Sequence, residues 1–599
     1  MKHLSLLLLL VAGLQTISLA QTNQIKGRVT DDSTGAALSD VSVTLPGKTG
    51  GTKTNDRGEF TLNIPANSPG KLTLTISLLG YSSQTVTAEP GKNISISLSR
   101  TATALEDVVV IGYGTVRRRN LTGSVSSVNS KQLRDVPLSS AAEALTGRLA
   151  GVQVTTTEGA PGADVLIRIR GGGSITQDNA PIYIVDGIQV ENALSFISPQ
   201  DIASVDVLKD AATTAIYGAR GANGVVIITT KSGKAGKTQV SYNGSFGWRE
   251  IAKKMDVLNP YDFVMWQWER NKLIPDTSFS RNYGSTWDTM NVYKNSPFIN
   301  WQEEVFGRKA GYQNHNVSVS GGSQATTFNL SLTSNKEDGI QLETGFDRKI
   351  ANFKLDHKAS DKFKIGFTAR YLDQQIQGAG TTNTGTRTTN RLRHSIQYRP
   401  YESANAPSVD EFDDELYRNS GNMVNPVLLT QAEYRRQYTR AVNLSGYVSY
   451  SILKNLVFRS TIGFDNNNQR TDLFYGKITN TARNNSSLPV ASIAQQNSTT
   501  FNISNTLQYS LPKFGDHSLD VMVAQEIYET KAKTNTTETR YFPADISPDK
   551  ALANMGLGSP PPGFQQPRPT SNETPPSRIF SVFGRVNYDW NNKLIAQFT

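Results

Sequence analysis

The side chains that most often carry catalysis are scarce and scattered in this chain. There are no cysteines, so the chain has no disulfide framework and no thiolate nucleophile or metal ligand. No Ser-His-Asp set and no paired carboxylates stand out. The five histidines lie far apart and none has metal-ligand spacing: His3, His315, His357, His394 and His517. We therefore predict no catalytic residues, no cofactor and no enzymatic activity.

One acidic run could hold a cation. Residues 410–417 read DEFDDELY, and Asp410, Asp413 and Asp414 carry the carboxylate oxygens that calcium prefers. Such a run is more often the solvated face of a loop. We predict no metal site, and these three aspartates are the candidates if one exists.

Two tryptophans could bind a sugar. Trp266 and Trp268 lie in YDFVMWQWER, where their rings could stack on the sugar rings of a bound molecule. The alternative is that both rings pack within a loop helix.

The segment EDVVVIGYGT, residues 106–115, suits binding to another protein. The run of β-branched residues from Val108 to Ile111 predicts a strand, yet it stops at glycines and runs into Arg117-Arg118-Arg119. An extended peptide with open backbone groups can add to the edge of a partner's sheet. The alternative is a linker strand that pairs within its own protein.

The first 20 residues and the charge of the chain indicate its cellular location and the partners it can bind. Residues 1–20 have the form of a secretory signal peptide, with Lys2, an apolar stretch and Ser18-Leu19-Ala20 before Gln21. No later stretch reaches the roughly 18 apolar residues of a spanning helix. The net charge of +10 is spread along the chain, so we predict no nucleic-acid partner.

Three regions position these residues. Residues 24–100 contain short alternating strands separated by turns, which predicts a small β-sandwich. Residues 116–233 predict a mixed α/β domain, with a helix from Ala141 to Leu149 and several strands. In it Gly171-Gly172-Gly173 and Asp186-Gly187 are predicted structural turns, and we expect the three glycines to let the backbone pass close to a surrounding wall.

Residues 238–599 alternate strictly between apolar and polar side chains. In KFKIGFTARY, for example, Phe363, Ile365 and Phe367 share one face with Ala369 and Tyr371. Strands of about ten such residues are typical of an outer-membrane barrel, and a soluble sandwich is the alternative. We count about eleven strands, with connections that alternate between long and short. Long loops at one end and tight turns at the other favour the barrel.

These parts, in this order, resemble the SusC/RagA-like branch of TonB-dependent outer-membrane transporters. The first region resembles a carboxypeptidase-regulatory-like domain through Gly27-x-Val29, Thr54-Asn55-Asp56-x-Gly58-x-Phe60 and Gly80-Tyr81. The rest is carried by DVVVIGYGT (107–115), LTGSVSSV (121–128), LAGVQV (149–154), IRIRGGGS (167–174), PIYIVDGI (181–188), residues 202–233, NWQEEVF (300–306) and residues 315–332.

The resemblance implies a fold and a set of partners. The fold class is mainly β: an N-terminal β-sandwich, a TonB box at 106–115, an α/β plug at 116–233 and the first half of a 22-stranded barrel at 238–599. TonB would bind the box through Asp107, Val108, Val109, Val110, Ile111, Gly112 and Tyr113. A SusD-like surface lipoprotein, a glycan or peptide cargo and outer-membrane lipid complete the expected partners, and the N-terminal domain would lie in the periplasm.

Two further expectations follow. The family implies active import of an oligosaccharide or peptide, and the alternative is an adhesin or scaffold that reuses the fold without importing. Because eleven strands are half of 22 and the last, NNKLIAQFT, still alternates at Thr599, we expect the natural protein to continue beyond this chain.

Overall fold

The computed structural model describes most of the chain from residue 24 to residue 599. The ranges left out are 46–50, 65–70, 79–80, 100–107, 112–113, 118–124, 135–139, 157–158, 176–178, 274–278, 280–282, 284–289, 379–390 and 403–423, together with residues 33, 164, 192, 513 and 592. The predicted signal peptide lies outside the described residues. The chain divides into two compact units, an N-terminal one that ends near residue 108 and one that holds residues 109–116 and 120–599.

The N-terminal unit is a β-sandwich, as predicted. One sheet has the order β4-β1-β7 and the other β3-β2-β5-β6. Alternating apolar residues, such as Leu72, Leu74 and Ile76, point into a shared core between them. The strands are β1 (Gln24–Asp31), β2 (Ser42–Thr44), β3 (Gly51–Lys53), β4 (Glu59–Asn63), β5 (Leu72–Ser77), β6 (Gln84–Ala88) and β7 (Asn93–Leu98).

Residues 125–230 form the α/β plug. Its main sheet has the order β10-β15-β16-β13-β14, and β11 pairs with β12 in a smaller sheet. The strands are β10 (Val125–Asn129), β11 (Val152–Thr156), β12 (Val165–Ile169), β13 (Ile182–Val185), β14 (Ile188–Gln189), β15 (Ile202–Leu208) and β16 (Val225–Thr230). Short helices α2 (Ser130–Arg134), η2 (Glu143–Leu145), α3 (Ala193–Phe196), η3 (Pro199–Asp201), α4 (Ala211–Thr214) and η4 (Ala215–Asn223) connect them.

The predicted helix from Ala141 to Leu149 is wrong. Only the 3-10 turn Glu143–Leu145 forms, although Ala141, Leu145 and Leu149 are buried as the helical pattern suggested. Gly147 has φ of 71°, in the left-handed region, which a right-handed helix cannot include. The apolar spacing therefore reflects burial of an irregular segment.

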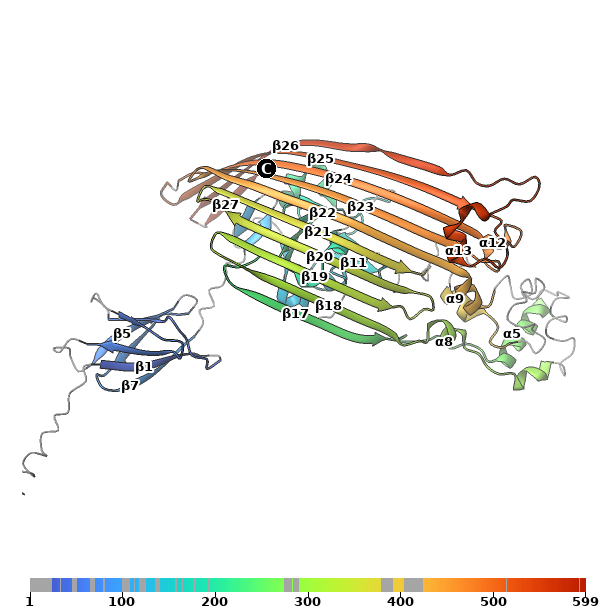
Figure 1. Cartoon of the computed structure of the whole chain (residues 1–599), viewed down its shortest axis with the longest axis horizontal. Coiled ribbons are helices and arrows are strands. Elements are labelled where there is room, and N and C mark those ends of the chain that lie inside the picture. The colour runs from blue at the N-terminus through green and yellow to red at the C-terminus, as the bar shows by residue number, and fades with distance from the viewer. Residues whose placement is uncertain are drawn as a thin grey trace, which may run out of the picture. The chain divides into compact units, whose positions relative to one another are not determined.

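The C-terminal region is one eleven-stranded sheet in which each strand pairs with the next along the chain (Figure 1). This confirms the predicted number of strands and is consistent with a barrel wall. The strands are β17 (Gly236–Arg249), β18 (Ala310–Gly322), β19 (Thr326–Asp338), β20 (Gly345–Lys358), β21 (Phe363–Gln377), β22 (Glu433–Leu453), β23 (Leu456–Tyr475), β24 (Val490–Ser510), β25 (His517–Thr539), β26 (Thr570–Trp590) and β27 (Leu594–Phe598).

Strands β22 to β26 are about twice as long as predicted, with 20 to 23 residues each. Apolar alternation marks only part of each strand. The remainder carries polar side chains on both faces, such as Asn466 to Arg470 in β23, so periodicity could not reveal it.

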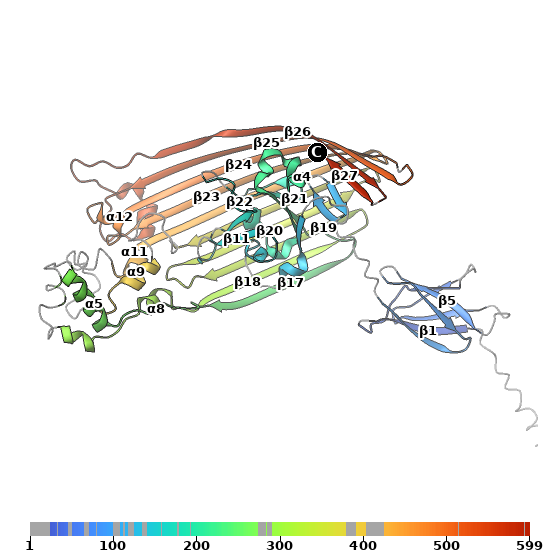
Figure 2. The same cartoon turned by 180° about the vertical axis from the view of Figure 1, so that it is seen from behind.

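The connections are long mainly at one end of the sheet. At that end lie residues 250–309, 339–344, 378–432, 476–489 and 540–569. The strands extend further than predicted, so 339–344, 476–489 and 540–569 are all much shorter than we expected. The connections at this end carry α5 (Pro260–Leu273), η5 (Asn291–Asn295), α8 (Trp301–Phe306), α9 (Arg391–Gln397), α11 (Pro426–Ala432), α12 (Asn480–Arg483), α13 (Pro548–Ala553) and η6 (Met555–Leu557). Seen from behind, these helices gather at the same end (Figure 2). Within the described residues, no helix has the length and apolarity needed to cross a membrane.

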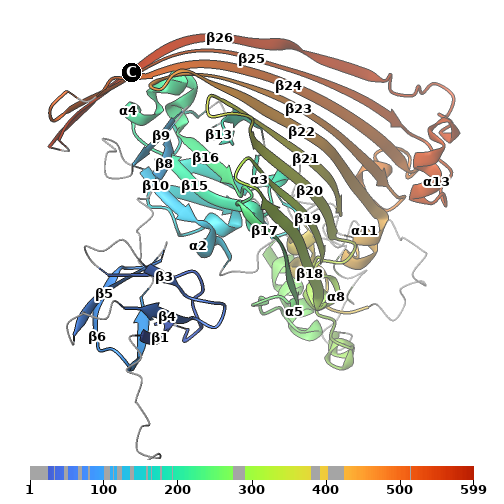
Figure 3. The ribbon, with the colours of Figure 1, turned by 60° about the vertical axis from the view of Figure 1, so that its left-hand side comes forward.

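The plug lies on the concave face of the curved sheet (Figure 3). Its core cluster takes in Ile350, Leu372 and Ala441, which belong to β20, β21 and β22. The plug and the sheet are therefore packed against each other.

The sandwich core yields a direct test of the N-terminal fold. Changing Leu74→Ala removes a fully buried side chain and should lower the free energy of unfolding by about 2–5 kcal/mol. Urea unfolding of residues 24–100 measures this change. Thr73→Ala, on the exposed face of the same strand, should leave the midpoint nearly unchanged, and equal midpoints for both variants would contradict the assignment.

Candidate functional site

The predicted partner-binding segment is paired within its own chain. β8 (Val108–Ile111) forms a two-stranded sheet with β9 (Gly114–Arg117), which is the arrangement that the alternative interpretation expected. Asp107, Gly112 and Tyr113 lie outside the described residues. Among the strands that the structure describes, β9 is the sole partner of β8, so one edge of β8 has no strand beside it.

The predicted Asp186-Gly187 turn joins β13 to β14. Both residues have positive φ, 49° and 94°, as a two-residue hairpin turn of this kind requires. Aspartate and glycine are favoured in such turns because they tolerate the left-handed region.

The turn aims the Asp186 carboxylate at the sheet wall. Lys354 of β20 donates to it with a nitrogen–oxygen distance of 3.1 Å, and Arg370 of β21 forms an ion pair with its other oxygen. Thr230 at the end of β16 donates its backbone N–H over 3.0 Å and its hydroxyl over 2.7 Å. These four residues are called the Asp186 cluster below.

Electrostatics keep the Asp186 carboxylate charged. Burial opposes ionisation, but Arg370, Lys354 and the Thr230 hydrogen bonds together hold the pKa of Asp186 well below its ordinary value. Because this pKa is lower in the folded protein, the stabilisation is fully present above the unfolded value near 3.9 and is lost as pH falls below it.

Further polar contacts join the plug to other strands. Ser331 of β19 donates to Asp201 over 2.5 Å, and Tyr528 of β25 donates to Glu191 over 3.2 Å. Arg220 of η4 lies 3.7 Å from the Glu526 carboxylate of β25. The plug is therefore held by polar contacts to strands on both sides of the sheet's curve.

The three predicted turn glycines form a turn, but they do not pass close to the sheet as we expected. Gly171 has φ of 92°, so the turn is present. A Cβ at Gly172 or Gly173 would lie nearest to Asn179 and Asn223, which both belong to the plug. Two other glycines do approach the sheet: a Cβ at Gly162 would come within 2.5 Å of the Phe346 ring on β20, and one at Gly233 within 2.3 Å of the Phe328 backbone on β19.

A cavity of about 380 Å³ lies between the plug and the sheet near the long connections. Its charged lining comprises Glu143 from the plug and Arg249, Glu337 and Arg348 from the sheet. Arg249 and Glu337 form an ion pair at 2.8 Å. Burial raises the pKa of Glu143, since the nearby arginines do not fully offset the loss of water.

The two predicted cargo-binding tryptophans lie on α5 but do not form one surface. Trp266 is 49% exposed, and the Arg270 guanidinium lies 4.9 Å from its ring centre. Trp268 packs against the loop core around Val264 and Met290. Residues two apart on a helix point about 200° apart, so at most Trp266 is free to stack on a ligand.

The candidate metal ligands Asp410, Asp413 and Asp414 lie outside the described residues. In the part of the chain that the structure describes, no group of three or more His, Cys, Asp or Glu side chains could hold a metal ion.

Two family models match the chain. Residues 25–110 match the CarboxypepD_reg-like domain, and residues 117–225 match the TonB-dependent Receptor Plug Domain. The second match covers most of the plug, including Asp186 and η4.

Curated relatives match over longer stretches. TonB-dependent receptor P26 of Formosa agariphila is 32% identical over 576 residues, which cover 94% of this chain and 54% of that protein. TonB-dependent receptor SusC of Bacteroides thetaiotaomicron is 34% identical over 387 residues, 63% of this chain and 36% of that protein. The chain spans about half the length of the curated relatives that it matches over most of its own length.

Solved structures share the fold. The RagAB peptide importer in its open-open state aligns with a TM-score of 0.66 and 23% identity, over 81% of this chain and 55% of that chain. The plug, the regulatory-like domain and the sheet thus occur here together, and the chain is a SusC/RagA-like TonB-dependent receptor.

Proposed function

We propose that this protein acts in TonB-dependent import of a large nutrient across the outer membrane. The observation that carries the proposal is a plug held on the concave face of a barrel-like sheet by buried ion pairs. Such a plug closes a wide lumen, and transport then requires work to move it. The relatives named as TonB-dependent receptors support TonB as the source of this work.

In this proposal the segment Asp107 to Tyr113 is the TonB box. Strand addition by a partner would use the edge of β8 that β9 leaves open, or would displace β9 altogether. A two-stranded hairpin alone is only marginally stable in water, so exchanging partners costs little free energy. The N-terminal β-sandwich would then lie in the periplasm.

Force on the box would reach the plug through the chain that follows it. The Asp186 cluster is the main electrostatic resistance, because separating its charges leaves buried ions without partners. Breaking a buried ion pair costs about 3–5 kcal/mol. The plug would therefore stay in place until it is pulled.

The cargo would enter from the side of the long connections. The 380 Å³ cavity there combines the Arg249–Glu337 ion pair with amide side chains such as Gln374 and Gln437, which can bind sugar hydroxyls or peptide groups. We accordingly propose an oligosaccharide or peptide as cargo, with a SusD-like lipoprotein closing over it and with Trp266 as a contact. The RagAB structures concern a peptide importer, which supports this size of cargo.

The competing function is an outer-membrane adhesin or scaffold that uses the same fold. That role needs neither a TonB box nor movement of the plug. Energised uptake separates the two functions.

The first prediction concerns the box. Val109→Pro removes a backbone donor from β8 and should abolish energised uptake while the receptor remains folded in the membrane. Uptake of a labelled cargo mixture by whole cells measures this effect. Val109→Thr keeps the donor and the strand preference and serves as the matched control. Normal uptake by the proline variant would exclude this segment as the TonB box.

The second prediction concerns the Asp186 cluster. Asp186→Asn suits the turn equally well but leaves Lys354 and Arg370 without their counter-charge, so plug docking should weaken by about 3–5 kcal/mol. Hydrogen exchange of the β13 and β16 amides in the purified receptor reports the change.

Thr230→Val is the control for this experiment. It removes the hydroxyl's hydrogen bond to Asp186 and the two longer ones that it accepts from Lys354 and Arg370, but it keeps all three charges. Its effect should therefore be about 1–2 kcal/mol, smaller than that of Asp186→Asn. Exchange rates that are the same in Asp186→Asn and the unaltered receptor would show that the ion pairs do not hold the plug.

A further inference from the structure

The outer face of the sheet, which is the face opposite the plug, carries an apolar band that ends abruptly on the side of the long connections. On β25, Met522, Glu526 and Tyr528 face the plug, so Val523 and Ile527 lie on the outer face, where they are exposed. The band ends on four adjacent strands at exposed apolar residues, which are Phe464, Phe501, Ile527 and Phe580. Polar residues follow immediately on the same face: Asn466, Thr499, Glu529 and Arg578.

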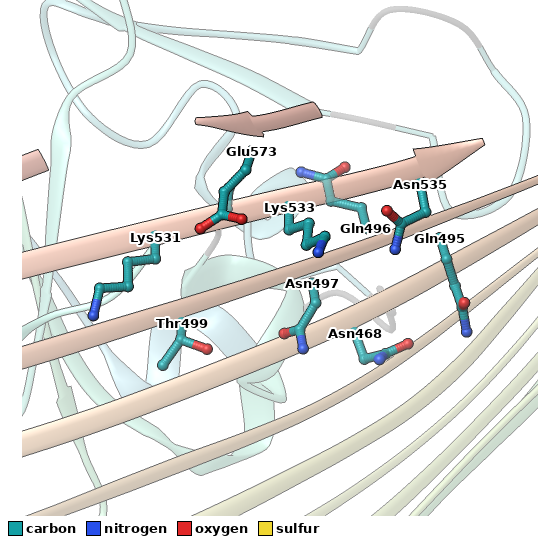
Figure 4. A pocket seen from close by; sticks show the side chains of 10 residues that line it. Asn468, Gln495, Gln496, Asn497, Thr499, Lys531, Lys533, Asn535 and Glu573 are labelled. Atoms are coloured by element: carbon teal, nitrogen blue, oxygen red, sulfur yellow. The ribbon is translucent and has the colours of Figure 1, made fainter. Parts of the chain in front are cut away.

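A polar pocket of about 440 Å³ opens directly beyond this edge (Figure 4). Lys531, Lys533 and Asn535 line it from β25, and Asn497 and Thr499 line it from β24. Lys531, Lys533 and Asn535 are separated from Val523 and Ile527 by even numbers of residues, so they lie on the same outer face of β25. Asn497 and Thr499 share the outer face of β24 with Phe501 in the same way.

A bulge in β26 shapes one side of the pocket. The register with β25 shifts between Thr530 and Ala532, and the extra residue falls at Pro575-Pro576. Proline lacks a ladder donor and is tolerated at bulges, which re-aim neighbouring side chains. Beyond the bulge Glu573 pairs with Lys533 and so lies on the outer face.

One lysine of the pocket has no ion-pair partner among the described residues. Glu529 binds both Lys531, at 2.6 Å, and Arg578, at 2.8 Å. Among the described residues Lys533 has no ion pair or hydrogen bond, although Glu573 lies opposite it in the ladder. Three cations therefore face two carboxylates, beside amide groups suited to hydroxyls.

The depth of the lysines matches a lipid headgroup. Lys531 and Lys533 follow Ile527 by four and six positions, which puts their backbones about 9 and 14 Å beyond the apolar edge at a strand tilt of about 45°. Lysine side chains can bend back along the surface by several ångströms. Their ammonium groups can thus reach the phosphates at the boundary of the lipid layer.

We infer that this pocket binds the phosphorylated sugar headgroup of a lipid in the surrounding outer leaflet. Lys531 and Lys533 bind its phosphate, while Asn497, Gln495 and Glu573 accept or donate hydrogen bonds with its sugar hydroxyls. The inference rests on the proposed function only in that the sheet spans the outer membrane with its long connections on the outside.

The test uses the full-length receptor in nanodiscs of phosphatidylcholine that contain a diphosphorylated glucosamine-disaccharide lipid. Native mass spectrometry measures how much of this lipid stays bound. The double variant K531Q/K533Q should retain about tenfold less of it than the unaltered receptor. The control K336Q/K349Q removes two exposed outer-face lysines on β19 and β20 and should retain it fully.

Two further arms identify the ligand. The same lipid without its phosphates should be retained weakly by all three proteins, and free inorganic phosphate should not displace the intact lipid. Equal retention by K531Q/K533Q, equal retention of the dephosphorylated lipid, or full displacement by inorganic phosphate would each overturn the inference. None of these measurements involves uptake, so a failed import proposal would leave their outcome unchanged.

Discussion

The Asp186 carboxylate of the plug meets Lys354 and Arg370 of the sheet in a buried contact that positions the plug. Each charge is costly to bury alone, and together they fix the plug at one position and height. The contact is possible because the turn after β13 adopts left-handed backbone angles that place the carboxylate beyond the edge of the plug. The cations come from adjacent strands, so the same contact also ties β20 to β21.

The rest of the interface between plug and sheet is mainly polar, which suits the proposed movement of the plug. The inner face of the sheet is lined by buried polar residues such as Asn316, Ser331 and Asn352. Among the described residues, the two core clusters of the plug include four buried sheet residues, which are Ile350, Leu372, Ala441 and Met522. The plug would therefore keep its own apolar core, around Val205 and Ile228, if it left the sheet as proposed. Polar contacts can be replaced by water, whereas separating two apolar faces would cost free energy in proportion to their area.

Sequence patterns predicted the architecture better than they predicted the site. Apolar alternation identified all eleven strands, and the Asp186-Gly187 pair identified a turn. The ion partners of Asp186 lie 168 and 184 residues away, and no local pattern reports such a contact. The polar halves of β22 to β26 lack alternation, which hid both their length and the outer pocket. Thr115 and Val116, which favour strands, were an available signal for the β8–β9 hairpin.

The proposed import requires the plug to move relative to the sheet. A Cβ built at Gly463 on β23 would lie 3.3 Å from the Cβ of Ile188 in the plug, close to the roughly 3.5–4.5 Å of a disulfide, and the chain has no cysteine of its own. The measurement is cargo uptake by the double variant Gly463→Cys/Ile188→Cys, oxidised and then reduced, with each single variant as control. We predict that oxidation stops uptake and that reduction restores it. Uptake at the full rate with the disulfide completely formed would show that import does not require the plug to move relative to the sheet.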